Sequence, residues 1–391
     1  MASKEKFLFL EPLRGVFALV VVVVHGDHVA NSSFILNDNI MFSNGTMLVD
    51  LFFQLSGFVI AYSYADRVHS LASAAAFQFN RFLRMYPLHI VTFLAFAVGF
   101  PLMEYFFELL SGRSSGFTPF HGFEVSAFFN NIFLTQGILE EHLNYNYPSW
   151  SVSVEFFTYL TFAIAFTLLP TKTLRIYASV LIVIISGLAL HLTDSRYPET
   201  GMALFRCTYS FFIGVLLFYV FSSFTVRVAP IFVYISFIVM FTVWYFGHYF
   251  SSLVTPFTYS FIFLSLLWSE MTGLKKFLCH PKLVFLGTVS YGIYMIHAAV
   301  WYIMGRILMK FFDYQMIWDT KNGNPHINTD PTLATILLVV GTCITIFLAH
   351  LSYKYLEMPF NRHAIKMSSV PKKTRGLGEY PLVYKKSDSN T

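Results

Sequence analysis

The stretch LFLEPLRGVFALVVVVVHGDH, from Leu8 to His28, decides the structural class of this chain. It is an apolar run long enough to cross a membrane, yet it carries an arginine and a histidine. Arg14 and His25 are eleven residues apart, so on a helix they share one face and lie roughly 16 Å apart along the axis. Ionisable groups inside a membrane are costly and indicate function by default. The structural alternative is an arginine that reaches the interface and a histidine that caps the far end of the helix.

The composition of the whole chain agrees with this segment. Of 391 residues, 56% are hydrophobic and only 12% are charged, whereas soluble domains carry about 25% charged residues. The 46 phenylalanines and 23 tyrosines suit lipid-facing surfaces and interfacial belts. The three cysteines are scattered and form neither a disulfide framework nor a zinc spacing. We therefore expect an all-α polytopic membrane protein with no permanently bound cofactor and no metal.

Ten apolar segments are long enough to span a membrane, and no soluble domain fits between them. We expect one ten-helix membrane domain over residues 1–360 and a basic cytoplasmic tail, disordered, over residues 361–391. The longest gap, residues 110–150, predicts a short interfacial helix or a lid. The expected spans are 8–28, 47–64, 86–109, 151–169, 174–192, 205–222, 230–247, 254–270, 284–308 and 332–353.

Loop charges alternate in sign along the chain. Lys and Arg lie before the first span and in every second loop after it, while Asp and Glu gather in most of the loops between. By the positive-inside rule, both termini are cytoplasmic in a multi-pass protein of the inner or plasma membrane. From Arg362 onward, seven Lys or Arg residues outnumber two acidic residues. This basic tail indicates topology and contact with anionic membrane lipid, and no folded basic module suggests nucleic-acid binding.

Two arginines lie close together before the third span, in FNRFLRMYPLH, residues 79–89. Arg81 and Arg84 are three residues apart, so on a helix they share a face, and Pro87 marks a break before the span. Two adjacent guanidinium groups form a bidentate receptor for an anion such as a phosphate. Positive-inside topology with lipid headgroup contact is the alternative for this pair.

The second span begins with a carboxylate and contains a small-residue motif. Asp50 opens the span, and FFQLSGF follows at residues 52–58. Ser56 and Gly57 in this motif permit close helix approach, which by itself explains the sequence as packing.

The fourth span begins YPSWSVSVEFF, residues 147–157. Trp150 is expected at the interface with Ser151 beside it, and Glu155 lies about one turn further in. A lone carboxylate there needs a cation or a water-filled cavity, and it is a candidate acid or base. Arg206, at the start of the sixth span, is its expected partner if both lie at the outer boundary.

The ninth span carries a polar stripe in LGTVSYGIYMIH, residues 286–297. Ser290, Tyr294 and His297 fall on one helix face, which is otherwise suited to lipid. A structural histidine with satisfied hydrogen bonds is the alternative reading of His297.

In this order, these pieces resemble the motifs of the membrane acyltransferase 3 family. Each motif is weak by itself, but the six together span nearly the whole chain. This chain departs from the family at Phe156, where many members have a second acidic residue. The matching pieces are Arg14 to His25, FFQLSGF, RFLRMYP, PSWSVSVE, SYGIYMIH and YLEMPF.

The resemblance implies an integral-membrane O-acyltransferase that moves an acyl group, usually acetyl, from cytoplasmic acyl-CoA to a hydroxyl of a sugar or polysaccharide. Arg81 and Arg84, with Arg14 deeper in the membrane, would hold the CoA phosphates. His25 would act as general base or carry the acyl group itself. Glu155 would orient a histidine or bind the acceptor. The supporting pocket would comprise Asp50, Ser56, Trp150, Ser151, Arg206, Tyr291 and His297.

Two other classes of protein remain open on the residues alone. In a transporter of an anionic or acylated solute, Arg14 and His25 would line a gated path. In a non-catalytic membrane scaffold, the polar residues would be replaceable. The clustering of basic and anion-binding side chains near the membrane surfaces favours the enzyme. The broken midplane helices and the repeats that are typical of transporters are not evident in the sequence, which argues against the transporter.

Overall fold

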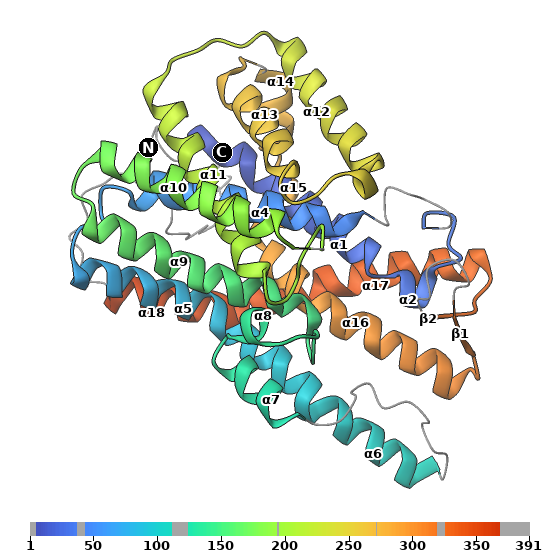
Figure 1. Ribbon diagram of the computed structural model, residues 1–391. Helices are drawn as coiled ribbons and strands as arrows, with labels where there is room; N and C mark the ends of the chain where they lie inside the picture. Colours follow the sequence, from blue (N-terminus) through green and yellow to red (C-terminus); the bar gives the residue numbers. More distant parts are fainter. Residues whose placement is uncertain are drawn as a thin grey trace, which may run out of the picture.

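The computed structural model describes residues 5–36, 44–111, 124–193, 195–270, 272–318 and 325–367. Over these ranges the protein is built from long helices, with one antiparallel two-stranded sheet. Figure 1 shows α1 passing through the middle of the assembly, with α12, α13 and α14 grouped on one side and the long α5–α6 helix on the other. The all-α prediction is confirmed. Residues 368–391 of the expected tail lie outside the described residues. Its predicted start, at residue 361, lies within the helix α18 (Met358–Met367).

The first half of the chain contributes α1 and three long helical segments that follow it, α4, α5–η3–α6 and α9. The α5–η3–α6 helix is the longest, and a π-helical turn, η3, lies within it. The elements are η1 (Glu5–Leu10), α1 (Glu11–Val24), α2 (Asp27–Ala30), η2 (Gly45–Met47), α4 (Leu48–Tyr64), α5 (Leu71–Leu94), η3 (Ala95–Gly99), α6 (Phe100–Ser111), α7 (Val125–Ile132), α8 (Gln136–Leu139), η4 (Tyr147–Ser149) and α9 (Trp150–Leu168).

The second half contributes the helices that close the assembly around α1 and α4. Figure 1 shows α16 and α17 side by side, with the β1–β2 hairpin connecting their ends. The elements are α10 (Lys172–His191), α11 (Ala203–Ser223), α12 (Pro230–Tyr245), η5 (Gly247–Tyr249), α13 (Thr255–Trp268), α14 (Thr272–Leu278), α15 (Pro281–Thr288), α16 (Ser290–Phe311), β1 (Met316–Trp318), β2 (Pro325–Ile327), α17 (Pro331–Ser352), η6 (Tyr353–Glu357) and α18 (Met358–Met367).

Eight helical segments within the described ranges are long and apolar enough to cross a membrane. The two remaining expected spans are helical as well, but α12 and α13 have only 16 and 14 residues. A perpendicular crossing needs about 20 residues. Each of the ten apolar segments that the sequence predicts is therefore helical over most of its length, and two of them are short for a span.

Two expected boundaries near the arginine and histidine motifs are wrong. Helix α1 ends at Val24, so His25 follows the helix instead of lying inside it. The third segment begins at Leu71, which places Pro87 within α5. Helix α5 continues through Pro87 and packs against α16. The Tyr291 hydroxyl donates to the backbone carbonyl of Met85 at 2.5 Å, and side chains of adjacent helices commonly satisfy backbone groups near a membrane proline.

The predicted ninth and tenth spans also differ from the structure. The ninth is broken at Val289, between α15 and α16. Helix α15 lies directly against α1. A Cβ on Gly287 would come within 2.3 Å of the Glu11 carbonyl oxygen, so a side chain has no room at this contact. Pro359, in the YLEMPF motif, does not end the last helical segment, because the chain stays helical into α18. The π-helical turn η6 directly precedes α18, so Pro359 lies inside a continuous helix.

Glycines set the closest helix crossing in the protein, between α4 and α11. A Cβ on Gly57 would lie 1.9 Å from the Phe211 carbonyl oxygen, and a Cβ on Gly214 would lie 2.0 Å from that of Gln54. Only hydrogen fits at either position, so the two backbones are in contact. The packing interpretation of the FFQLSGF motif is confirmed for Gly57.

Candidate functional site

The centre of the candidate site is a pair of histidines from opposite ends of the sequence. His25 lies immediately after α1, and His297 is fully buried in α16. The His297 Nε2 atom lies 3.0 Å from the His25 Nδ1 atom. The two rings are stacked, with centroids 5.0 Å apart and an interplanar angle of 16°. The structure therefore brings together two residues that the sequence predicted separately.

One hydrogen bond and one close packing contact hold the end of α1 in place and explain why the two histidines meet. The Trp301 indole, one turn after His297 in α16, donates its Nε1–H to the Val22 carbonyl of α1 at 3.0 Å. Gly26 follows His25, and a Cβ there would lie 2.6 Å from the Leu338 side chain in α17. The end of α1 is thus held between α16 and α17, and this fixes the position of His25.

The Nε2 atom of His25 is the free end of the pair. The contact with His297 is made by Nδ1, and the His25 ring also lies within hydrogen-bonding range of the Val21 backbone carbonyl. A neutral imidazole whose Nδ1–H is donated has its lone pair on Nε2, where it can accept a proton or attack an acyl carbon. The arrangement suits general-base or nucleophilic chemistry at His25.

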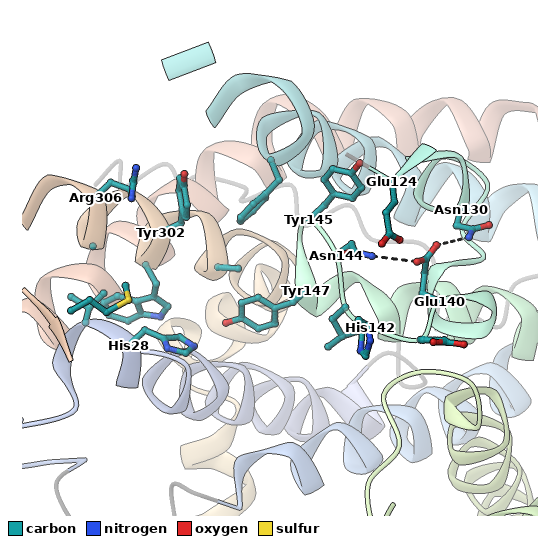
Figure 2. A pocket seen from close by; sticks show the side chains of 18 of the residues that line it. His28, Glu124, Asn130, Glu140, His142, Asn144, Tyr145, Tyr147, Tyr302 and Arg306 are labelled. Atoms are coloured by element: carbon teal, nitrogen blue, oxygen red, sulfur yellow. Dashed lines mark hydrogen bonds between the residues drawn. The ribbon is translucent and has the colours of Figure 1, made fainter. Parts of the chain in front are cut away.

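A cavity of about 700 Å³ lies next to the histidine pair and is separated from it by Tyr147, which lines the cavity and contacts both histidine rings. In Figure 2, Tyr147 lies in its middle, Arg306 and Tyr302 lie at one end, and Glu124 and Glu140 lie at the other. Loop residues 139–147, α16 and the β1–β2 hairpin supply most of its walls. The apolar and aromatic lining consists of Val29, Phe96, Leu139, Leu143, Tyr145, Tyr147, Ala298, Trp301, Tyr302, Met309, Met316 and Ile327.

Carboxylates and amides define the polar end of the cavity. Glu140 accepts hydrogen bonds from the side-chain amides of Asn130 and, at 3.3 Å, Asn144. Burial and the nearby charges of Glu140 and Glu124 raise the pKa of Tyr145, so this phenol stays neutral and can donate. Such a mixture of tyrosine, amide and carboxylate groups can bind the hydroxyls and the faces of a sugar.

The opposite end of the cavity is closed by a buried ion cluster. Glu104 of α6 binds both Arg306 and Lys310 of α16, and the Tyr302 hydroxyl is directed at the same carboxylate at 3.5 Å. Because Glu104 compensates these cations, Arg306 presents a partly neutralised guanidinium to the cavity. This ion cluster also attaches α6, the helix that follows the π-helical turn η3, to α16.

The predicted phosphate-binding arginines belong to a second polar cluster. Arg81 is buried, and its Nη2 donates to the Tyr64 hydroxyl at 3.0 Å. Its Nε has no hydrogen-bond partner in the described part of the chain. Arg84 lies within electrostatic range of Tyr291 and Glu357. An unsatisfied buried donor beside a second arginine is suited to an anion.

Glu155 lies in this arginine cluster and makes no hydrogen bond to either histidine within the described residues. The Tyr159 hydroxyl donates to Glu155 at 2.6 Å and also contacts the Ser56 hydroxyl at 2.8 Å. Tyr159 is within electrostatic range of both Glu155 and Arg81. The structure thus places Glu155 and Ser56 beside the arginines, and the predicted orientation of a histidine by Glu155 is not seen.

A polar column connects the arginine cluster to the histidine pair. Ser151, one turn before Glu155 in α9, donates to the Tyr294 hydroxyl at 3.0 Å. The Tyr294 ring lies 5.9 Å from that of His297. The predicted polar stripe on α16 therefore lies between the arginine cluster and the histidine pair. Arg14 lies on α1, three turns before His25, and no hydrogen bond or ion pair to it occurs in the described part of the chain.

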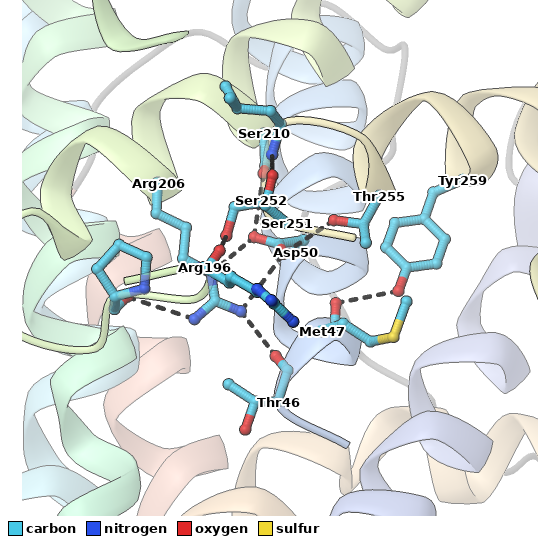
Figure 3. A network of polar contacts seen from close by, with 12 residues as sticks. Thr46, Met47, Asp50, Arg196, Arg206, Ser210, Ser251, Ser252, Thr255 and Tyr259 are labelled. Carbon is cyan, nitrogen blue, oxygen red and sulfur yellow. Dashed lines mark hydrogen bonds and ion pairs between the residues drawn. The ribbon is translucent and has the colours of Figure 1, made fainter. Parts of the chain in front are cut away.

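Asp50 and Arg206 form a separate buried ion pair, so the predicted pairing of Arg206 with Glu155 is wrong. Arg206 Nε donates to Asp50 Oδ1 at 2.9 Å, and both side chains are fully buried. Figure 3 shows Ser210 and Thr255 directed at the same carboxylate, and Thr46 accepting from Arg206. Asp50 is nearer to Arg206 than Glu155 is, because α4 and α11 cross closely.

The Arg206 guanidinium also lies over the Trp150 ring, 5.3 Å from its centroid. None of the site residues that the sequence predicted lines the 700 Å³ cavity, and this includes His25 and His297.

The sequence profile of the acyltransferase 3 family, described as an acyltransferase domain, matches residues 7–350. The chain belongs to this family. It is 33% identical over 178 residues to the acyltransferase MdmB of Streptomyces mycarofaciens, which covers 42% of this chain and 41% of that protein. It is 34% identical over 97 residues to protein 2 of the picA locus of Rhizobium radiobacter, covering 25% and 47% respectively. The chain thus matches less than half the length of these curated relatives, and no solved structure matches it.

Family membership confirms the resemblance that the six motifs carried, and the apolar helices agree with a multi-pass membrane protein of this family. Sequence reasoning nevertheless missed much of the cavity. Tyr147, Tyr302 and Arg306 were not selected, because single aromatic or basic residues at span ends are also typical of interfacial anchors. The only signal was the aromatic and acidic character of residues 110–150.

Proposed function

We propose that this acyltransferase transfers an acyl group, with acetyl as the expected group, from cytoplasmic acyl-CoA to a hydroxyl of a sugar or polysaccharide. The protein is placed in the inner or plasma membrane with both termini in the cytoplasm, as the loop charges predict. One observation carries the proposal. Ser151 and Tyr294 lie between the arginine cluster, at the predicted cytoplasmic end, and the histidine pair, which Tyr147 separates from the cavity at the predicted outer end.

The donor would bind at the arginine cluster. Arg81 and Arg84 offer adjacent guanidinium groups to the phosphates of CoA, and the unsatisfied Nε of Arg81 supports an anionic ligand there. The thioester arm of CoA would follow the column towards His25. Acyl-CoA is a consumed substrate in this scheme, and no permanently bound cofactor is required.

At the other end, the acceptor hydroxyl would lie in the cavity beside His25 Nε2. His25 takes the proton of the hydroxyl, whose oxygen bonds to the acyl carbon. The carbon–sulfur bond then breaks, and the CoA thiolate receives the proton from His25. In the alternative route His25 Nε2 first carries the acyl group and then passes it to the acceptor. The same residues serve both routes.

The test uses purified protein with radiolabelled acetyl-CoA and a panel of acceptors that includes monosaccharides and n-octyl β-D-glucoside. Wild type is expected to release CoA and form labelled ester, and His25→Ala is expected to form none while it still binds acetyl-CoA. His28→Ala is the matched control, since His28 lines the same cavity but is exposed, and it should retain most activity. Absence of CoA binding and of ester on every acceptor would overturn the proposal.

A further inference from the structure

Tyr147 lies where the cavity meets the histidine pair. Its ring contacts the edge of His25, with centroids 5.0 Å apart, and lies 5.9 Å from that of His297. Its hydroxyl is 3.4 Å from the His297 Nε2 atom. In Figure 2 the side chain is also part of the cavity wall. Tyr147 is therefore close both to the expected base and to the space where the acceptor would bind.

Two proton donors compete for one nitrogen in this arrangement. His297 Nε2 lies 3.0 Å from His25 Nδ1 and 3.4 Å from the Tyr147 hydroxyl. One imidazole nitrogen offers one lone pair. When His25 acts as base through Nε2, its proton must be on Nδ1, and this proton is donated to His297 Nε2. The lone pair of His297 is then occupied, so the Tyr147 hydroxyl proton is available to the reacting group.

We propose that Tyr147 is a catalytic residue whose hydroxyl donates a hydrogen bond to the acyl carbonyl oxygen as negative charge develops on it. This inference rests on the proposed acyl transfer. As the acceptor oxygen bonds to the acyl carbon, its proton passes to His25 Nε2, and the carbonyl electron pair moves onto the oxygen that Tyr147 binds. When this electron pair re-forms the carbonyl double bond, the carbon–sulfur bond breaks, and the CoA thiolate takes the proton from His25. Every proton is conserved, and Tyr147 keeps its own.

A phenol is suited to this role in a buried site. It is a neutral donor, so it costs less to bury than a cation, and in a low-dielectric surrounding its hydrogen bond to an anion is strong. The donor is also preorganised, because the Tyr147 backbone begins η4 and Pro148 follows it. Loss of one such oxyanion donor lowers kcat by about 100- to 1,000-fold in other acyl-transfer enzymes.

Tyr147→Phe tests the proposal, because it removes only the hydroxyl and keeps the ring that packs on His25. With the best acceptor of the panel, kcat is expected to fall at least about 100-fold, while the KM for acetyl-CoA and the melting temperature stay near wild type. Tyr209→Phe is the matched control. Tyr209 is buried and its hydroxyl donates to the Leu253 carbonyl at 3.1 Å, but it does not line the cavity, so its kcat should change less than about tenfold.

The possible results separate this inference from the proposed function. If wild type is active and Tyr147→Phe keeps its kcat, or only raises the KM for the acceptor, the hydroxyl does not stabilise the transition state and the inference is overturned. An equal loss of kcat in Tyr209→Phe would also overturn it, since the effect would then follow from the loss of any buried tyrosine hydroxyl. If wild type forms no ester on any acceptor, the proposed function itself fails.

Discussion

The Nε2 atom of His297 lies 3.0 Å from the Nδ1 atom of His25, although 272 positions separate the two residues in the chain. This contact fixes the ring plane of His25 and selects which of its nitrogens is free. A hydrogen-bonded second group that sets tautomer and orientation is a common feature of histidine bases. We therefore expect His297 to act through His25 as a positioning residue.

Replacement of His297 tests that role. His297→Leu is expected to lower kcat about 100-fold, because the Nδ1–H of His25 loses its acceptor, while the KM for acetyl-CoA changes little. His297→Gln should retain more activity, since the amide oxygen can accept the same hydrogen bond. Steady-state kinetics of the two variants provide the comparison. Equal activity of the leucine and glutamine variants would show that the hydrogen bond is not what matters.

The arginine cluster predicts a defect in donor binding. Arg84→Gln is expected to raise the KM for acetyl-CoA at least about tenfold, because one charge-assisted contact to a phosphate contributes about 1.5–3 kcal/mol. Arg227→Gln is the control: Arg227 forms an exposed ion pair with Glu270 at 3.4 Å, far from any predicted site. The measurement is initial rate against acetyl-CoA concentration at low and high salt. A wild-type KM in Arg84→Gln would remove the arginine from the donor site.

The buried pair of Asp50 and Arg206 predicts a defect in stability. Arg206→Met should lower the free energy of unfolding by about 3–5 kcal/mol, because the Asp50 carboxylate is left without its cation. The double variant Asp50→Leu/Arg206→Met should recover most of that loss. Denaturant unfolding in detergent micelles measures both. Arg227→Gln, at the exposed pair, should show no measurable change, and a double variant as unstable as the single one would contradict this account.

The crossing of α4 and α11 predicts that only glycine is tolerated at two positions. Gly57→Ala and Gly214→Ala should each destabilise the protein by about 1–3 kcal/mol or more, since their Cβ atoms would lie 1.9 and 2.0 Å from backbone oxygens. Gly273→Ala in α14 is the matched control, because no atom lies within 4 Å of its Cβ position. Thermal unfolding compares the three variants. Stable Gly57→Ala protein would mean that the helices can separate without cost.

The local motifs were predictable because each is carried by neighbouring residues. Arg81 and Arg84 share a face through helical periodicity, and so do Tyr294 and His297 on α16. The partner of Arg206 was not predictable in this way. Glu155 and Asp50 are equally plausible partners in the sequence, and the choice depends on which helix α11 crosses closely. That crossing follows from Gly57 and Gly214 together, 157 positions apart.

The sequence by itself determined that this is an all-α membrane protein of the acyltransferase 3 family, with basic and anion-binding side chains on particular helices. Hydropathy, charge alternation and motif order are local properties, and they persist whatever the packing. Only the tertiary structure decided that His25 contacts His297, that Tyr147 lies between this pair and the cavity, and that Asp50 forms an ion pair with Arg206. These contacts arise where helices distant in the chain approach within hydrogen-bonding distance, and that approach is set by the sum of many packing contacts.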